Sequence, residues 1–153
     1  NSGMHAMDIM RMESGFLHWG HDISPEENQY QAGLAFTISD KKDVEFIGKK
    51  ALAKIKKEKI KNRFAMFTLK ESEPGKPLLL HDEPIYIDDK IIGRSTSGNY
   101  SFNFKKNLVF GYIDNDLSNH ELQSKNLFIE VEKQKYPIEI QLEPLKRTDF
   151  KNL

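Results

Sequence analysis

The sequence predicts an α+β protein: a segment of helices and a short strand, residues 1–62, followed by a small six-stranded antiparallel β-barrel, residues 63–153. The first part contains apolar residues at helical spacing, as in Met4, Met7 and Met10, whereas the second part contains short runs in which apolar and polar residues alternate. The composition, 38% hydrophobic and 30% charged, is that of a chain able to form a core and not of a disordered one.

The first predicted helix spans residues 2–14 and ends before Gly15. Met4, Met7 and Met10 recur every three residues, so they share one amphipathic face, which we call the methionine face. An apolar face without a core of its own tends to find a neighbour. We therefore expect this face to be partly exposed or buried against another chain, with self-association as one outcome.

The stretch from Arg11 to Leu34 holds the single Trp of the sequence and two of its five His. Ser24, followed by Pro25 and by Glu27 three residues on, has the pattern of a capping box and predicts a short helix. Loops this rich in polar and aromatic residues are more often binding elements than spacers. We expect an ordered binding loop before the short helix.

Apolar residues alternate over 34–38 and predict a short strand. Gly48 then opens a second predicted helix, Lys49 to about Lys59. Eight basic residues and one acidic residue occur from Lys49 to Arg63, a pattern that fits an RNA-docking surface or a solvated helix face. No aromatic residues interleave these lysines, as single-strand binders usually require, so the solvated face is favoured.

Six short runs beyond residue 62 have the character of strands. The predicted strands are 63–70, 84–88, 90–96, 108–113, 126–132 and 135–143. Asp88-Asp89 and Lys133-Gln134 are predicted as tight turns of antiparallel hairpins, and two prolines make 73–77 a loop. Closing such strands into a barrel removes their exposed edges, which favours that architecture.

Charge and cysteine content exclude several classes of function. Basic and acidic residues balance at 23 each, so no overall field attracts the chain to nucleic acid or to a membrane. The absence of cysteine excludes disulfides, thiolate metal sites and a cysteine nucleophile. No apolar run approaches the length of a membrane span and no signal-peptide pattern is present, so we expect a soluble cytoplasmic protein.

Arg11 has two compatible interpretations. It follows Asp8 by three residues, which is the spacing of a same-face ion pair on a helix. Its guanidinium also suits a carboxylate-bearing ligand, because it offers a planar, bidentate set of donors. Asp22 is expected to cap or orient the loop.

His18 and His21 form an H-x-x-H pair, which on a helix can share a metal ion. Gly15 and Gly20 disfavour a helix here, and no third ligand stands at a useful spacing, so we predict structural histidines and no metal site. Trp19 either stacks on a flat ligand or fills the core.

The run from Gly93 to Gly98, GRSTSG, combines glycines with hydroxyls that suit a phosphate. No helix is predicted to follow it, and it fits neither the P-loop nor the dinucleotide pattern. We interpret it as a strand that ends in an irregular turn.

Three segments together resemble a known family: Ala6 to Leu34, Phe46 to Leu52, and Ser95 to Gly98. They are similar to the C-terminal part of the folate-dependent aminomethyltransferases, which include the glycine cleavage T-protein and the folate-binding portion of dimethylglycine and sarcosine dehydrogenases. The motif His18-Trp19-Gly20 is more similar to the dehydrogenase branch of the family. The resemblance covers only the C-terminal part of such proteins, so we expect this chain to be a fragment.

This resemblance implies transfer of a one-carbon unit to tetrahydrofolate from an amine such as dimethylglycine, sarcosine or carrier-bound glycine. It implies that Arg11, Trp19 and Arg147 line the folate cavity. The family's catalytic carboxylate belongs to the N-terminal half, so we expect no catalytic residue here and no activity from the fragment alone. Its expected partner is the missing N-terminal part of the same protein.

A second hypothesis is a non-catalytic interaction module that uses the basic helix, residues 49–61, for assembly or RNA contact. We do not expect nucleic-acid binding, because the solvated-face interpretation is favoured.

The two hypotheses differ in their expected RNA affinity. If residues 49–61 are a solvated face, the chain binds single-stranded RNA weakly, and the affinity falls steeply with salt, because such binding rests on counterion release. Fluorescence anisotropy with a labelled RNA at two salt concentrations measures this. Sub-micromolar, sequence-dependent binding at physiological salt would support the interaction module instead.

Overall fold

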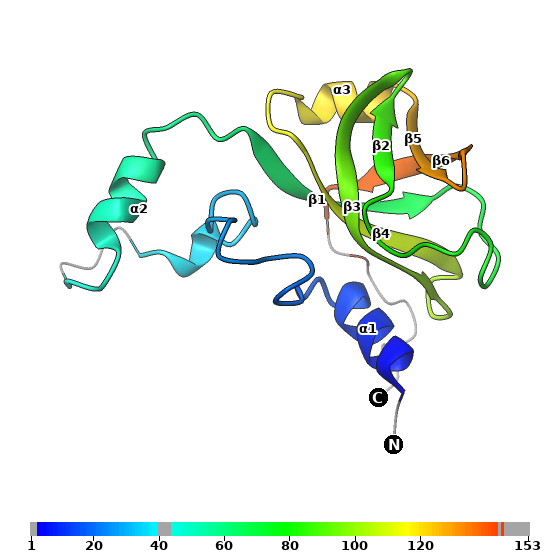
Figure 1. Cartoon of the computed structure of the whole chain (residues 1–153), viewed down its shortest axis with the longest axis horizontal. Helices are drawn as coiled ribbons and strands as arrows, with labels where there is room; N and C mark the ends of the chain where they lie inside the picture. The colour runs from blue at the N-terminus through cyan, green and yellow to red at the C-terminus, as the bar shows by residue number, and fades with distance from the viewer. Residues whose placement is uncertain (1–2, 40–43, 144, 146–153) are drawn as a thin grey trace.

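The computed structural model, which describes residues 3–39, 44–143 and 145, contains a closed antiparallel barrel with the strand order β1-β4-β3-β2-β5-β6 (Figure 1). The predicted α+β class and the six-stranded barrel are confirmed. Helix α1 lies beside the barrel, and the chain between α1 and β1 leads away from the barrel to α2 (Figure 1).

The strands are β1 Asn62–Leu69, β2 Pro84–Ile87, β3 Lys90–Ser101, β4 Lys106–Asp114, β5 Leu127–Val131 and β6 Gln134–Gln141. The helices are α1 Met4–Glu13, η1 Ala35–Thr37 (a 3₁₀ turn), α2 Lys49–Ile55 and α3 Asn119–Ser124. All six strands lie where alternation predicts them, since every strand has one face inside the barrel. None of the described helices is long and apolar enough to cross a membrane.

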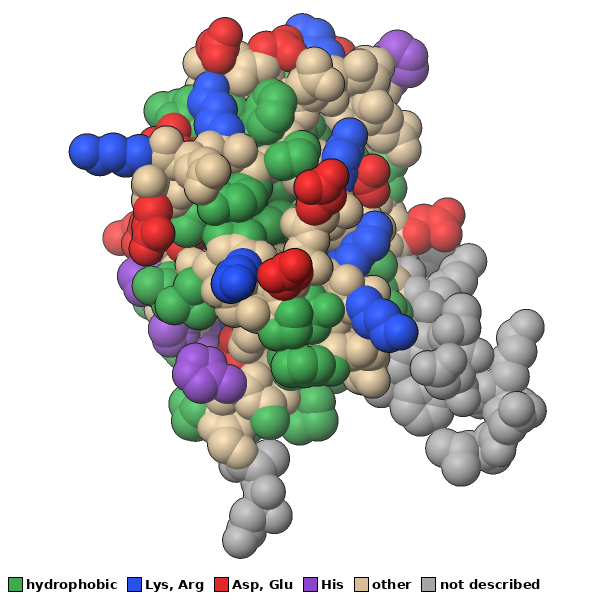
Figure 2. Space-filling view, turned by 90° about the vertical axis from the view of Figure 1, so that its right-hand side faces the viewer, with side chains coloured by type: hydrophobic (Ala, Val, Ile, Leu, Met, Phe, Trp, Pro, Cys, Tyr) green, Lys and Arg blue, Asp and Glu red, His purple; other side chains and the backbone are tan. Residues whose placement is uncertain are grey.

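Helix α1 packs against β3 and β4 through one side only. Met12 is fully buried and contacts Leu108 and Phe110 of β4. The methionine face points elsewhere, and its three side chains are 48% to 70% exposed. Other hydrophobic side chains also reach the surface among charged ones (Figure 2). In the part of the chain that the structure describes, the methionine face is therefore partly exposed, as expected.

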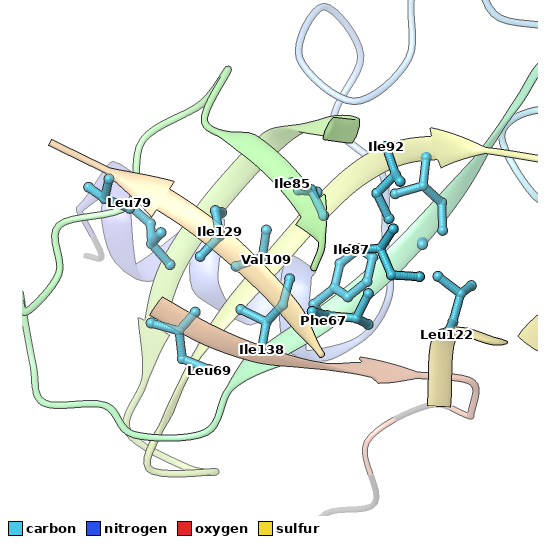
Figure 3. Packing of buried hydrophobic residues seen from close by; sticks show 14 residues of the cluster. Phe67, Leu69, Leu79, Ile85, Ile87, Ile92, Val109, Leu122, Ile129 and Ile138 are labelled. Carbon is cyan, nitrogen blue, oxygen red and sulfur yellow. The ribbon is translucent and has the colours of Figure 1, made fainter. Parts of the chain in front are cut away.

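The barrel interior is a single apolar cluster (Figure 3). Phe67, Val109 and Ile129, from three different strands, are 0% exposed and point toward one another. Leu79 of the β1–β2 connection and Leu122 of α3 lie at opposite sides of this cluster (Figure 3). Because the core is complete without α1 or α2, we infer that the barrel supports its own folding.

Turn geometry confirms one predicted hairpin and shifts the other. The loop 88–89 joins β2 to β3, as predicted. Between β5 and β6 the two-residue loop is Glu132-Lys133 and not Lys133-Gln134, because Val131 pairs with Gln134. Glu132 and Lys133 both have positive φ, 51° and 64°, the backbone that a two-residue hairpin prefers.

The predicted helix after Ser24 is wrong, although part of its signal is real. The Ser24 backbone N–H and hydroxyl both donate to Glu27 Oε2, at 2.8 and 2.7 Å, but residues 24–33 form turns. The side chain of Asn28 accepts from the backbone N–H groups of Tyr30 and Gln31, each at 3.0 Å. Such side-chain bonds offer the backbone an alternative to helix.

The predicted strand at 34–38 is also wrong: Ala35–Thr37 is a 3₁₀ turn, and Phe36 is 82% exposed. A strand needs an edge to pair with, and a closed barrel offers none. Helix α2 ends at Ile55, earlier than predicted, and buries no residue. Helix α3 lies outside the predicted elements, although Ser118 and Glu121 form a capping box at its start.

Gly98 provides a stability test of the packing between β3 and Leu79. An ideal Cβ at Gly98 would lie 2.4 Å from Leu79 Cβ, so Gly98→Ala should destabilise the fold by about 1–3 kcal/mol, despite the gain usual for Gly→Ala. Chemical denaturation measures the free energy of unfolding. Gly3→Ala is the matched control, because its added methyl meets nothing within 4 Å. Equal stability of the two variants would contradict the packing at Leu79.

Candidate functional site

Arg11 sits at the joint between α1, the following loop and the barrel. Its Nε donates to Asp8 Oδ1 at 2.8 Å, which confirms the predicted same-face pair. Its Nη2 donates to the Ser97 hydroxyl of β3 at 2.7 Å, and its Nη1 donates to the Asp22 carboxylate. With its side chain 14% exposed, Arg11 therefore has a protein acceptor at every guanidinium nitrogen.

Asp22 is the other centre of this joint and is 1% exposed. Besides Arg11, its carboxylate accepts from Thr96 Oγ1 at 2.6 Å, Ser97 Oγ at 2.8 Å and the His18 backbone N–H at 2.8 Å. A buried carboxylate is stable only when it is paired and hydrogen-bonded, and here both conditions are met. The prediction that Asp22 orients its loop is confirmed, and the same carboxylate also bonds to β3.

Tyr112 of β4 also holds Asp22, through the backbone of that residue. Its hydroxyl donates to the Asp22 carbonyl oxygen at 2.9 Å. Burial raises the pKa of the Tyr112 hydroxyl, and the carboxylates of Glu27 and Asp22 raise it further. The hydroxyl thus stays protonated as a donor across the physiological range.

Helix α1 is bonded to β3 and to the turn after it at further points. Asn99 Nδ2 donates to the His5 carbonyl oxygen at 3.4 Å. The Ser101 hydroxyl donates to Glu13 Oε1 at 2.5 Å, and Asn103 Nδ2 donates to Glu13 Oε2 at 2.7 Å. Glu13 is 6% exposed, so its charge too is compensated by the barrel. Polar residues of β3 therefore hold the helix along its length.

The hydroxyls of 95–97 belong to a continuous strand. The predicted strand end near Thr96 is wrong, because β3 runs on to Ser101. Its pairing with β4 shifts register between Ser95 and Ser97, as in a β-bulge. Successive side chains of a regular strand point to opposite faces, whereas a bulge re-aims one of them. This explains how the neighbours Thr96 and Ser97 both reach the carboxylate of Asp22.

A cavity of about 470 Å³ lies between α1, the loop 17–21, the loop 78–81 and the outer face of β3 at 96–99. This volume is within the usual range of small-molecule sites. Apolar side chains dominate its wall. They are Met4, Met7, Leu17, Trp19, Leu78, Leu79 and Leu80.

Two of the three residues predicted to line a folate cavity meet here. Arg11 and Trp19 both line this cavity. Trp19 is 65% exposed, so it is not the core residue of the alternative interpretation. Arg147 lies outside the described residues. The only carboxylate among the described lining residues is Asp8, which is paired with Arg11.

Histidines gather at the rim of the same cavity, which is lined by His5, His18, His21 and His81. Figure 2 shows histidine side chains grouped at one edge of the molecule. The rings of His18 and His21 lie 4.5 Å apart between centroids and are tilted by 32°. Among the described residues, no three His, Cys, Asp or Glu side chains are arranged to hold a metal ion.

Family models match both parts of the chain. Residues 62–146 match the glycine cleavage T-protein C-terminal barrel domain, and residues 1–42 match the GCVT N-terminal domain. These matches confirm the family resemblance carried by the N-terminal motifs and by Ser95 to Gly98.

Individual proteins similar to this chain indicate the same family. The chain is 34% identical over 149 residues to the mitochondrial dimethylglycine dehydrogenase of Homo sapiens, covering 97% of this chain and 16% of that protein. It is 32% identical over 113 residues to the mitochondrial sarcosine dehydrogenase of Mus musculus, covering 74% of this chain and 12% of that protein. It is 32% identical over 111 residues to an aminomethyltransferase of Symbiobacterium thermophilum, covering 72% of this chain and 28% of that protein.

A solved structure shares the fold. The aminomethyltransferase T of the glycine cleavage system from Bartonella henselae aligns with a TM-score of 0.77 and 19% identity, over 93% of this chain and 38% of that one. The chain thus spans well under half the length of this structure and of the relatives described above.

The histidine rim leads to a prediction about metal. We expect the purified chain to carry less than one equivalent of zinc, because two imidazoles on a non-helical loop do not complete a tetrahedral site. Elemental analysis measures the zinc content, and a chelator should leave the melting temperature unchanged. His18→Ala serves as the comparison and should have the same metal content. One zinc per chain, lost in that variant, would contradict the structural interpretation.

Proposed function

The chain belongs to the glycine cleavage T-protein family, and we propose that it is part of a tetrahydrofolate-dependent protein that transfers a one-carbon unit from an amine. On this proposal, residues 1–62 complete a folate-binding domain and residues 63–153 form the barrel domain. The boundary is supported by the start of β1 at Asn62 and by the separate family matches on either side of it.

The observation that carries the proposal is the joint lining of one cavity by Arg11 and Trp19. An exposed indole beside aliphatic side chains suits a flat aromatic ligand such as the pterin or aminobenzoyl ring of tetrahydrofolate. Arg11 is paired internally, but its partner Asp8 is 29% exposed while Asp22 is inaccessible. We propose that a folate carboxylate competes with Asp8 for Arg11, and that Arg147 adds a further contact.

Catalysis is assigned to a preceding region of a longer protein. One-carbon transfer needs two reactants held together and a carboxylate near the reacting nitrogen. Asp8, the acid lining this cavity, is already paired with Arg11, so we assign no catalytic residue to this chain. On the same proposal, the preceding region covers the exposed methionine face, and the chain by itself is inactive. Alternatively, self-association of two copies of this chain buries the methionine face.

The amine donor is proposed from the relatives. Two of them are named for dimethylglycine and sarcosine and one for aminomethyl transfer, so we propose one of these amines, or carrier-bound glycine, as the donor. A cytoplasmic location fits the composition, whereas the mammalian relatives are named as mitochondrial. The alternative function, an interaction module, is favoured by one observation: α2 lies away from the barrel and buries no residue.

Calorimetry with tetrahydrofolate tests the proposal. The 153-residue chain should bind no better than about millimolar, roughly 4 kcal/mol, because it supplies only one wall of the site. A longer protein that includes the preceding region should bind more tightly. In that protein Arg11→Ala should weaken binding by about 1–3 kcal/mol, since a charged hydrogen bond is lost.

Arg63→Ala is the matched control, because Arg63 donates to Asn119 Oδ1 and the Leu117 carbonyl oxygen, away from the cavity. It should leave tetrahydrofolate affinity unchanged. Micromolar binding by the 153-residue chain alone would show that the site is complete here and would contradict the fragment proposal.

A further inference from the structure

We propose that Asp22 is a positioning residue: its buried carboxylate fixes the cavity wall made by Arg11 and the loop 17–21 onto strand β3. The positional claim rests on the geometry of this chain alone. Its consequence for ligand affinity rests on the proposed function.

The first argument is the division of the carboxylate between two parts of the fold. Oδ2 accepts from Arg11 and from the His18 backbone N–H, which belong to α1 and to its loop. Oδ1 accepts from Thr96 and Ser97, which belong to β3. One carboxylate therefore links the two, and removing it breaks both sets of bonds.

The second argument concerns Trp19. It is 65% exposed, so packing does not hold it. The loop's own backbone bonds do: the Asp22 N–H donates to the His18 carbonyl and the Gly20 N–H donates to the Ile23 carbonyl, both at 2.8 Å. Asp22 closes this turn and anchors it to the barrel. The backbone that carries the indole is thus held by Asp22, which does not itself line the cavity.

The third argument is the bulge in β3. Without the register shift between Ser95 and Ser97, Thr96 and Ser97 would point to opposite faces of the sheet. Bulges occur where a side chain must be re-aimed, and here both hydroxyls are aimed at the same oxygen, Asp22 Oδ1. The barrel strand is shaped to receive this carboxylate, which an incidental surface contact would not require.

The experiment compares variants of the 153-residue chain by amide hydrogen exchange and by the fluorescence anisotropy of Trp19. Asp22→Asn should speed exchange at the His18 amide by about tenfold or more, because loss of a charged, buried acceptor opens the loop locally, and it should lower the anisotropy of Trp19. Barrel amides such as those of Phe67 and Val109 should keep their protection. Asp116→Asn is the control, since that carboxylate bonds to Lys59 on the surface.

A matched pair at Thr96 removes the ambiguity of a folding defect. Thr96→Val keeps the shape and loses the hydroxyl, so it should mobilise Trp19, whereas Thr96→Ser keeps the hydroxyl and should restore the native anisotropy. If Asp22→Asn does not fold, this pair and Ser97→Ala decide. Unchanged Trp19 anisotropy and His18 exchange in Thr96→Val and in the folded Asp22 variant would overturn the proposal.

Tetrahydrofolate titration of the longer protein separates this inference from the proposed function. If both hold, Asp22→Asn and Arg11→Ala each weaken binding, and the double variant is no weaker than the worse single one, because the two residues act as a unit. Loosening of the loop with no folate binding by any variant would leave Asp22 as a positioning residue and refute the folate assignment. Additive losses would show that Arg11 contributes to binding independently of Asp22 and would overturn the stated consequence of Asp22 for ligand affinity.

Discussion

The attachment of α1 and its loop to the barrel centres on one ion pair, Arg11 with the buried carboxylate of Asp22. Breaking a buried pair by removing one partner typically costs about 3–5 kcal/mol, because it leaves an uncompensated charge. Here the pair is completed by the hydroxyls of Thr96 and Ser97, and Tyr112 holds the backbone of Asp22. The pair and these hydroxyls hold the helix, the loop and the strand together, and Arg11, Thr96 and Ser97 also line the cavity beside them.

Strand β3 serves two structures at once. One of its faces contributes Ile92 to the apolar interior of the barrel, while polar side chains such as Ser97 and Ser101 bond to α1 and its loop. The barrel core needs nothing from residues before β1, whereas α1 buries little apart from Met12 and relies on these polar bonds. The dependence therefore runs one way. The closed barrel is the base to which the wall bearing Trp19 is attached.

The sequence predicted what is local. Alternation located every strand because each has a buried face, and the three-residue spacing of Asp8 and Arg11 predicted their pair. The same alternation failed at residues 34–38, since a strand also needs a partner edge, which a sequence window does not contain. Local sequence patterns could not predict the contact of the loop with β3, because Asp22 bonds to Thr96 and Ser97, which lie 74 and 75 residues away in the sequence. A buried role for a lone Asp leaves no periodic signal.

The chemical character of the cavity wall depends on how its charged side chains are paired. Arg11 and Asp8, the arginine and the acid among the described residues that line it, are paired with each other, and Arg11 is further held by Asp22. What faces the cavity is mainly aliphatic, with an exposed indole and imidazoles at the rim. Such a wall suits a ligand with a flat aromatic part, and under the proposed function a ligand carboxylate reaches Arg11 by competing with Asp8, the more exposed of its two carboxylate partners. Because Asp8 and Asp22 both hold Arg11, we assign the catalytic carboxylate, under the proposed function, to a preceding region of a longer protein.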